Sequence, residues 1–198
     1  EDYVSVGGDF VTESDARTGS SYGSDNALTA GTMELKGNFQ QKRVQDNDSR
    51  NYDASNFNAT GTHKVIFSGE GTQTVSFESP SYSGFNDVET QNTDIKFTTE
   101  IRGWTMQRDA VFKNGIVQGI KGSLDLNGHT LEIQGNFVEG DGNVLIHKGS
   151  LKVTGDYRIQ NVTGDGTYGQ CSGYIRMENE EDYVSVGGDF VTESDART

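Results

Sequence analysis

Short stretches in which apolar and polar residues alternate recur along the chain, and each ends in the same way. Gly, then Asn or Asp, then an aromatic residue closes the stretches at 3–10 (YVSVGGDF), 32–39 (TMELKGNF), 130–137 (TLEIQGNF), 150–157 (SLKVTGDY) and 183–190 (YVSVGGDF). Alternation with a period of two predicts β-strands with one buried and one exposed face. The residues expected on the buried face are Val4, Val6, Met33, Leu35, Leu131, Ile133, Leu151 and Val153.

The closing residues of each stretch are the candidate structural residues of the chain. Glycine permits a sharp turn, and Asn or Asp tolerates the left-handed region or bonds its own backbone. The aromatic residue then returns to the core, where stacked rings would form a ladder at the strand spacing of roughly 4.8 Å. The predicted corner and ladder residues are Gly8, Asp9, Phe10, Gly37, Asn38, Phe39, Gly135, Asn136, Phe137, Gly155, Asp156, Tyr157, Gly188, Asp189 and Phe190.

The chain also contains a longer repeat, which includes several of the short ones. Residues 181–198 are identical to residues 1–18, which predicts one unit over 1–180 and the start of the next identical unit over 181–198. Weaker stretches at 64–71 and 95–104 bring the unit to about six coils. Segments rich in Ser, Asp, Asn and Gly, at 13–26, 41–56 and 161–173, are predicted to be exposed loops.

The pattern predicts an all-β fold, since apolar residues nowhere recur at helical spacing over ten or more positions. Two arrangements fit. The constant polarity of the motif favours a parallel β-solenoid, or β-helix, of about six coils per 180 residues. The Asn127-Gly128 pair is a strong hairpin signal and favours an antiparallel meander or sandwich instead.

Composition narrows the classes of partner that the chain is expected to bind. The 16 basic and 30 acidic residues give a net charge of −14, which disfavours binding to nucleic acid and to anionic membranes. No run approaches the roughly 18 apolar residues of a membrane span, and we expect no leader segment. Hydrophobic residues make up only 31%, which indicates a thin, elongated core. The single cysteine, Cys171, excludes an internal disulfide.

The stretches DLNGHTLEIQGNF, GSLKVTGDYRIQ and YIRMENEEDYVSVGGDFVTES, with LTAGTMELKGNFQQ and NATGTHKVIFSGEGTQTVSFESPSYSGFND, resemble an uncharacterised tandem repeat of very large bacterial surface proteins. The resemblance implies a secreted or wall-attached, repetitive, β-rich scaffold, and it supplies no catalytic or binding residues to carry over. DLNGHTLEI also resembles coils of right-handed parallel β-helices, a fold shared by adhesins, phage fibres and polysaccharide-cleaving enzymes.

That second resemblance makes polysaccharide cleavage the sharpest enzymatic alternative. Asn92-Thr93-Asp94 matches one element of a polygalacturonase-like pattern, but the paired Asp-Asp, Gly-His-Gly and Arg-x-Lys elements are missing. Glycoside hydrolysis needs two carboxylates that flank one bond. We therefore expect a turn at 92–94, and no enzyme.

Candidate ligands for ions are sparse, and no cofactor is predicted. The acidic loops could bind calcium, because they supply hard oxygen ligands, yet their spacing matches no EF-hand or nonapeptide calcium repeat. The three histidines are too far apart for a zinc site and are expected at the surface. Cys171 has no activating partner in sequence. The loop residues in question are Asp46, Asn47, Asp48, Asp53, Asp141 and Asp165, and the histidines are His63, His129 and His147.

The sequence therefore predicts a structural protein, the repeat of an extracellular fibre or adhesin stalk on a bacterial surface. Its expected partners are neighbouring identical repeats, in the same chain or end to end, with lateral fibre contacts as a further possibility. Carbohydrate binding is the alternative, because loop tyrosines stack on sugars. The tyrosines concerned are Tyr22, Tyr52, Tyr82 and Tyr168.

Overall fold

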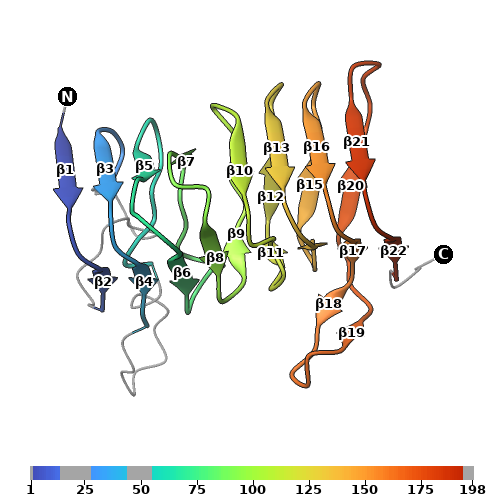
Figure 1. Ribbon diagram of the computed structural model, residues 1–198, viewed down its shortest axis with the longest axis horizontal. Helices are drawn as coiled ribbons and strands as arrows, with labels where there is room; N and C mark the ends of the chain where they lie inside the picture. The colour runs from blue at the N-terminus through green and yellow to red at the C-terminus, as the bar shows by residue number, and fades with distance from the viewer. Residues whose placement is uncertain (1, 14–27, 44–54, 194–198) are drawn as a thin grey trace.

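The computed structural model describes residues 2–13, 28–43 and 55–193. These ranges contain only β-strands, turns and loops, and thus no helix that could span a membrane. The strands stand side by side in a row, with the N-terminus at one end and the C-terminus at the other (Figure 1). The predicted all-β class is confirmed.

The strands of the alternating stretches form a first row. They pair in parallel in two sheets of four, β1-β3-β5-β7 and β10-β13-β16-β21. β7 and β10 are in contact, and the Val111 amide donates to Thr90 Oγ1 (3.2 Å). The first-row strands are β1 (Tyr3–Val6), β3 (Thr32–Leu35), β5 (Lys64–Phe67), β7 (Asp87–Thr90), β10 (Ala110–Phe112), β13 (Thr130–Ile133), β16 (Ser150–Val153) and β21 (Tyr183–Val186).

A second row follows the corner. Its strands pair in the same order, as β2-β4-β6-β8 and β14-β17-β22, again in parallel. We call each first-row strand, with the second-row residues that follow it, a rung. The second-row strands are β2 (Phe10–Thr12), β4 (Phe39–Gln41), β6 (Gln73–Phe77), β8 (Ile95–Phe97), β14 (Phe137–Val138), β17 (Tyr157–Ile159) and β22 (Phe190–Thr192).

Smaller parallel sheets, β9-β11 and β12-β15-β20, complete the other side of the row. Only β18 and β19 pair antiparallel among the described strands. The remaining bounds are β9 (Ile101–Arg102), β11 (Ile120–Lys121), β12 (Ser123–Asp125), β15 (Asn143–Leu145), β18 (Asn161–Val162), β19 (Tyr168–Gly169) and β20 (Tyr174–Arg176).

The antiparallel alternative is wrong for these rows. Asn127 and Gly128 both have positive φ (48° and 82°) and connect β12 to β13, but those two strands belong to different sheets. The pair therefore forms the corner between two sheets. A hairpin signal specifies a tight turn, but here β13 pairs with β10 and β16 rather than with the preceding strand, β12.

The described first row has seven steps from β1 to β21, one more than the predicted count of about six coils. The discrepancy arises at residues 95–104, which supply β8 and β9 and no first-row strand. The first-row strands there, β7 and β10, lack the closing motif.

The buried faces form one continuous core along the row. The alternating pattern holds well in the middle, where Leu131, Ile133 and Leu151 are fully buried. At the N-terminal end Val4 is 53% exposed, whereas the identical Val184 packs against the core.

Candidate functional site: the corner ladder and the groove beside it

The corner glycines bring the backbones of successive rungs together. A Cβ on Gly37 would collide with the Gly8 and Asp9 backbone, and one on Gly155 would lie 2.8 Å from the carbonyl carbon of Gly135. Of the motif glycines only Gly135 has a positive φ, of 136°. Contact between rungs, rather than turn conformation, therefore accounts for glycine at 37, 155 and 188.

The Asn and Asp side chains of the corners also act between rungs. Each Oδ1 accepts a hydrogen bond from a backbone N–H of the rung that follows. None of these residues has a positive φ. The bonds are Asn38 N to Asp9 (2.8 Å), Thr74 N to Asn38 (2.8 Å), Asp156 N to Asn136 (2.9 Å) and Asp189 N to Asp156 (3.0 Å).

The direction of these four bonds is the same, and they form a ladder in two runs, one from Asp9 to Thr74 and one from Asn136 to Asp189. At Asp156 the Asp189 N–H, with the Arg158 guanidinium, holds the pKa of the carboxyl below its ordinary value. A carboxylate that accepts backbone N–H bonds is stabilised in its charged form.

The motif rings lie in two runs. Phe10 stacks on Phe39 with centroids 5.7 Å apart and planes at 12°, and Phe137 stacks on Tyr157 at 4.9 Å and 23°. Phe190 continues the second run edge-on to Tyr157 at 5.2 Å. Between the runs, Val75, Phe97 and Ile116 occupy the ladder positions.

Sequence reasoning missed a ring cluster beside the first run. Phe57 and Phe85, from segments without the motif, lie 4.8 Å and 5.0 Å from Phe39. His63 lies 6.2 Å from Phe57 and is 3% exposed, so the prediction that it lies at the surface is wrong. Burial lowers its pKa, and its Nδ1 has no partner. The only signal in sequence was the presence of apolar rings inside loop-like segments.

Glu34 joins three rungs on the outer face of the first row. Its Oε2 accepts from Ser5 Oγ (2.6 Å) and Tyr3 OH (2.7 Å), and its Oε1 accepts from Ser68 Oγ (2.7 Å). The hydroxyls of Ser5, Ser68 and Tyr3 lower the pKa of Glu34 to about 2.

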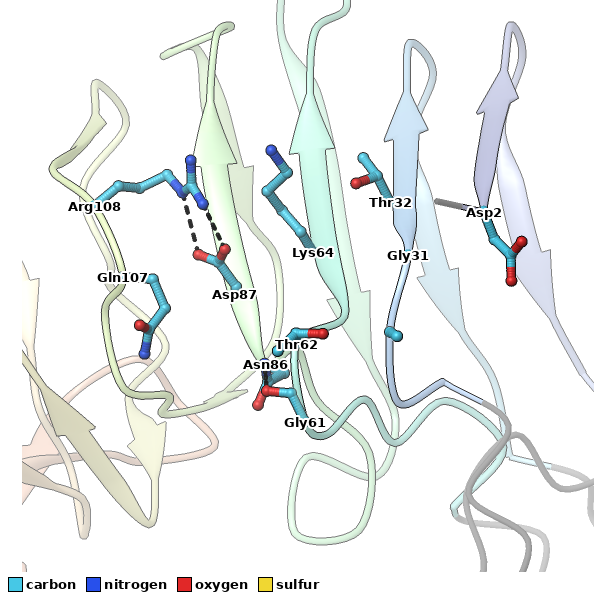
Figure 2. Close-up of a pocket in the computed structure, with 11 residues that line it drawn as sticks. Asp2, Gly31, Thr32, Gly61, Thr62, Lys64, Asn86, Asp87, Gln107 and Arg108 are labelled. Atoms are coloured by element: carbon cyan, nitrogen blue, oxygen red, sulfur yellow. Dashed lines mark hydrogen bonds and ion pairs between the residues drawn. The ribbon is translucent and has the colours of Figure 1, made fainter.

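A groove of about 730 Å³ crosses the starts of the first-row strands β1, β3, β5 and β7. Figure 2 shows Asp2, Thr32, Lys64, Asp87 and Arg108 along it, each from a different rung. Polar and charged residues predominate among those labelled, and none is aromatic.

Three charged residues of the groove, Lys64, Asp87 and Arg108, take part in ion pairs. Arg108 donates to both oxygens of Asp87 (Nη2 at 2.7 Å, Nε at 3.3 Å) and to Glu89 (3.1 Å). Lys64 donates to the same Glu89 oxygen at 2.9 Å. The Gln91 amide and Lys64 lower the pKa of Glu89. This network connects the start of β10 to β7, where the two sheets of the first row meet.

A buried acid, Glu139, directly follows β14. Glu139 is fully buried, its Oε2 accepts from the Tyr157 hydroxyl, and its Oε1 has no hydrogen-bond partner. Burial raises the pKa of Glu139 to about 7, against the opposing effect of the Tyr157 hydroxyl and the Val144 and Tyr174 amides. Cys171 is 4% exposed in the same region, so its thiol faces the core rather than a neighbouring fibre.

Asn92 and Asp94 lie at the corner between β7 and β8, and their side chains form hydrogen bonds there. Asn92 Nδ2 donates to Gly71 O and Gln73 Oε1, both at 2.9 Å. Asp94 accepts from Asn114 Nδ2 (2.5 Å) and Thr72 Oγ1 (3.0 Å), and these groups lower its pKa. Both side chains thus join neighbouring rungs.

The other candidate ligands are dispersed. Of the candidate calcium ligands, Asp46, Asn47, Asp48 and Asp53 lie outside the described residues. Asp141 accepts from Ser172, and Asp165 accepts from Thr163 and Thr167 within one turn. Over the described ranges, no three His, Cys, Asp or Glu side chains are grouped as a metal site would require.

His129 lies 3.6 Å from Asp109, and His147 lies 3.0 Å from Asp125, both partly exposed. Tyr82 and Tyr168 are 44% and 39% exposed, and the Arg158 guanidinium lies 4.7 Å from the Tyr168 ring centroid. Tyr22 and Tyr52 lie outside the described residues.

Comparison with protein-family models, with curated proteins and with solved structures found no match to this chain.

Proposed function

We propose that the chain is the structural repeat of an extracellular bacterial fibre or adhesin stalk, built as a parallel β-solenoid whose coils stack end to end. The observation that carries the proposal is the succession of parallel rungs in two adjoining sheets, of which the first and the last described rungs have the same sequence. The free edge of the last rung in such a column can pair with a further rung, so the column can be extended by adding units.

The distribution of side chains supports a structural role. The corner residues that repeat most faithfully bond to the next rung, and the paired charges of the groove join rungs as well. Repeat proteins are stabilised by such nearest-neighbour contacts, and their exposed ends must be covered. The negative charge and the polar loops suit a surface in contact with water.

Electron microscopy of the native protein tests this function. Long filaments of uniform width, with an axial repeat that matches one 180-residue unit, are the expected result. Compact, monodisperse particles in native material would reject the proposal.

Carbohydrate binding is the second candidate, and the groove across the β1, β3, β5 and β7 starts favours it. Its lining of hydroxyl, amide and charged groups offers hydrogen bonds to a sugar chain laid along the column. A glycan array on the purified chain is the direct test. Signals that vanish in Arg108→Ala would support it, and an array blank across many sugar classes would reject it.

A further inference from the structure

We infer that β1–β2 and β21–β22 represent one and the same rung, at which one 180-residue unit passes into a second copy of itself. The inference rests on the proposed function and identifies the partner and register of the junction. Residues 1–18 and 181–198 are identical, but their neighbours lie on opposite sides. β1–β2 pair with the rung that follows, β3–β4, whereas β21–β22 pair with the rung that precedes, β16–β17.

The two copies use different backbone groups of the same first strand. In the first copy the carbonyls accept, at Asp2 from Thr32 N (2.9 Å) and at Val6 from Lys36 N (3.0 Å). In the second copy the amides donate, at Tyr183 to Gly149 O (3.2 Å) and at Gly187 to Val153 O (2.9 Å). The two sets do not overlap, so one strand can make both at once.

The second strand follows the same rule. Phe10 N donates to Asn38 O, and Thr12 O accepts from Lys42 N, both at 2.8 Å. In the other copy Asp189 O accepts from Tyr157 N (2.9 Å), and Glu193 N donates to Ile159 O (3.2 Å). The groups used at positions 10 and 12 are thus distinct from those used at positions 189 and 193.

Side chains divide between the two neighbours as well. A Cβ on Gly8 would meet nothing within 4 Å, but the identical Gly188 is pressed against Gly155 and Asp156 of the preceding rung. Conversely, the Asp9 carboxylate accepts from Asn38 N of the following rung. The preceding rung explains the glycine and the following rung explains the aspartate, so the sequence of this segment suits both neighbours together.

The register at the junction follows from the two observed halves. On the free edge of β21–β22, Tyr183 lies opposite Thr32 of the second copy and Phe190 lies opposite Phe39, as Tyr3 and Phe10 do in the first copy. This placement covers the exposed ring of Phe190 (51%), because its counterpart Phe10 packs against the core beside the following rung. It also brings the hydroxyls of residues 183 and 185 to Glu34 of that copy.

Hydrogen exchange tests the junction in a two-repeat chain, in which residues 1–180 are followed directly by residues 1–198. The 198-residue chain is the reference. In the two-repeat chain the Phe190 amide should exchange at least about tenfold more slowly than in the reference, because it gains the acceptor that Phe10 already has. The Tyr183 amide, bonded in both chains, is the internal control. Equal Phe190 exchange in the two chains overturns the inference.

A substitution provides an independent readout. Asp189→Ala should lower the midpoint of urea unfolding of the two-repeat chain and leave that of the 198-residue chain unchanged. In the 198-residue chain, Asp9→Ala should lower the midpoint, because Asp9 accepts from Asn38 N there. No effect of Asp189→Ala in the two-repeat chain would also contradict the junction. These measurements are made within one chain, so native material without filaments would reject the proposed function and leave this result standing.

Discussion

At the level of single residues, the corners show that neighbouring rungs decide which side chains are tolerated. Gly155 must lack a Cβ because the Gly135 backbone lies against it, while Gly164, in the turn between β18 and β19, has open space around it. Both are glycines in polar surroundings. Only the structure separates the one that is required from the one that is not.

Gly155→Ala should therefore destabilise the chain by about 1–3 kcal/mol, because the added methyl group forces the β13 and β16 rungs apart. Gly164→Ala is the matched control and should stay within about 0.5 kcal/mol of the parent. Urea unfolding followed by circular dichroism measures both. Equal effects of the two substitutions would contradict contact between rungs as the reason for the glycine.

Glu139 makes stability depend on pH in an unusual direction. Its pKa is about 7 in the folded chain, against an ordinary value of 4.5 for a glutamic acid in water, so folding favours the protonated acid. The contribution is fully present below pH 4.5 and is lost as pH rises through about 7. A shift of this size corresponds to about 3 kcal/mol at alkaline pH.

We expect Glu139→Gln to remove this contribution to the pH dependence and to raise the melting temperature at pH 8 more than at pH 5. The amide keeps the shape of the protonated acid and cannot ionise. Glu180→Gln, at an exposed carboxylate, is the control. Melting curves from pH 4.5 to 8.5 make the measurement, and parallel pH profiles of the Glu139→Gln chain and the parent would rule out the buried acid as their cause.

Among the elements, the step from β7 to β10 differs from the others. The two strands are in contact, but they belong to separate sheets, and Arg108 joins them through Asp87 and Glu89. The Asp87 side chain is only 8% exposed and lies 2.7 Å from that guanidinium. An arginine that makes two bonds to one carboxylate holds geometry as well as charge.

Arg108→Ala should cost about 1–2 kcal/mol, since it leaves a largely buried carboxylate without its partner, and Arg108→Lys should restore part of the loss. The control is Arg176→Ala, which removes an exposed pair with Glu178 at 3.7 Å and should cost less than about 0.5 kcal/mol. Chemical unfolding at low and high salt measures both. A loss at Arg108 no larger than that at Arg176 would exclude this role.

The sequence predicted the elements whose alternation and closing motif coincide, such as β13, β16 and β21. It missed β7 and β10 as first-row strands, because DVET and AVF lack the closing motif and their partner is found only in space. It predicted that the Asn and Asp side chains of the corners act within their own turns, whereas they accept bonds from the next rung. The partner of each lies in the next rung, about twenty to thirty-six residues away in sequence. A pattern of neighbouring residues cannot predict contacts over such a separation.

For the whole molecule, the seven steps of the first row set an axial rise. At roughly 4.8 Å per step, each 180-residue unit adds about 34 Å. Small-angle X-ray scattering of chains with one, two and four units should therefore give maximum dimensions that grow by this increment, at constant cross-section. Growth of the cross-section instead of the length would show that the units fold back on one another.

The ladder of Asn and Asp side chains has one further consequence. Every bond in it points the same way, with the earlier residue as acceptor and the later backbone as donor. In the proposed fibre the two ends would therefore be chemically unlike, and a fibre attached by one end would present the chemistry of the other.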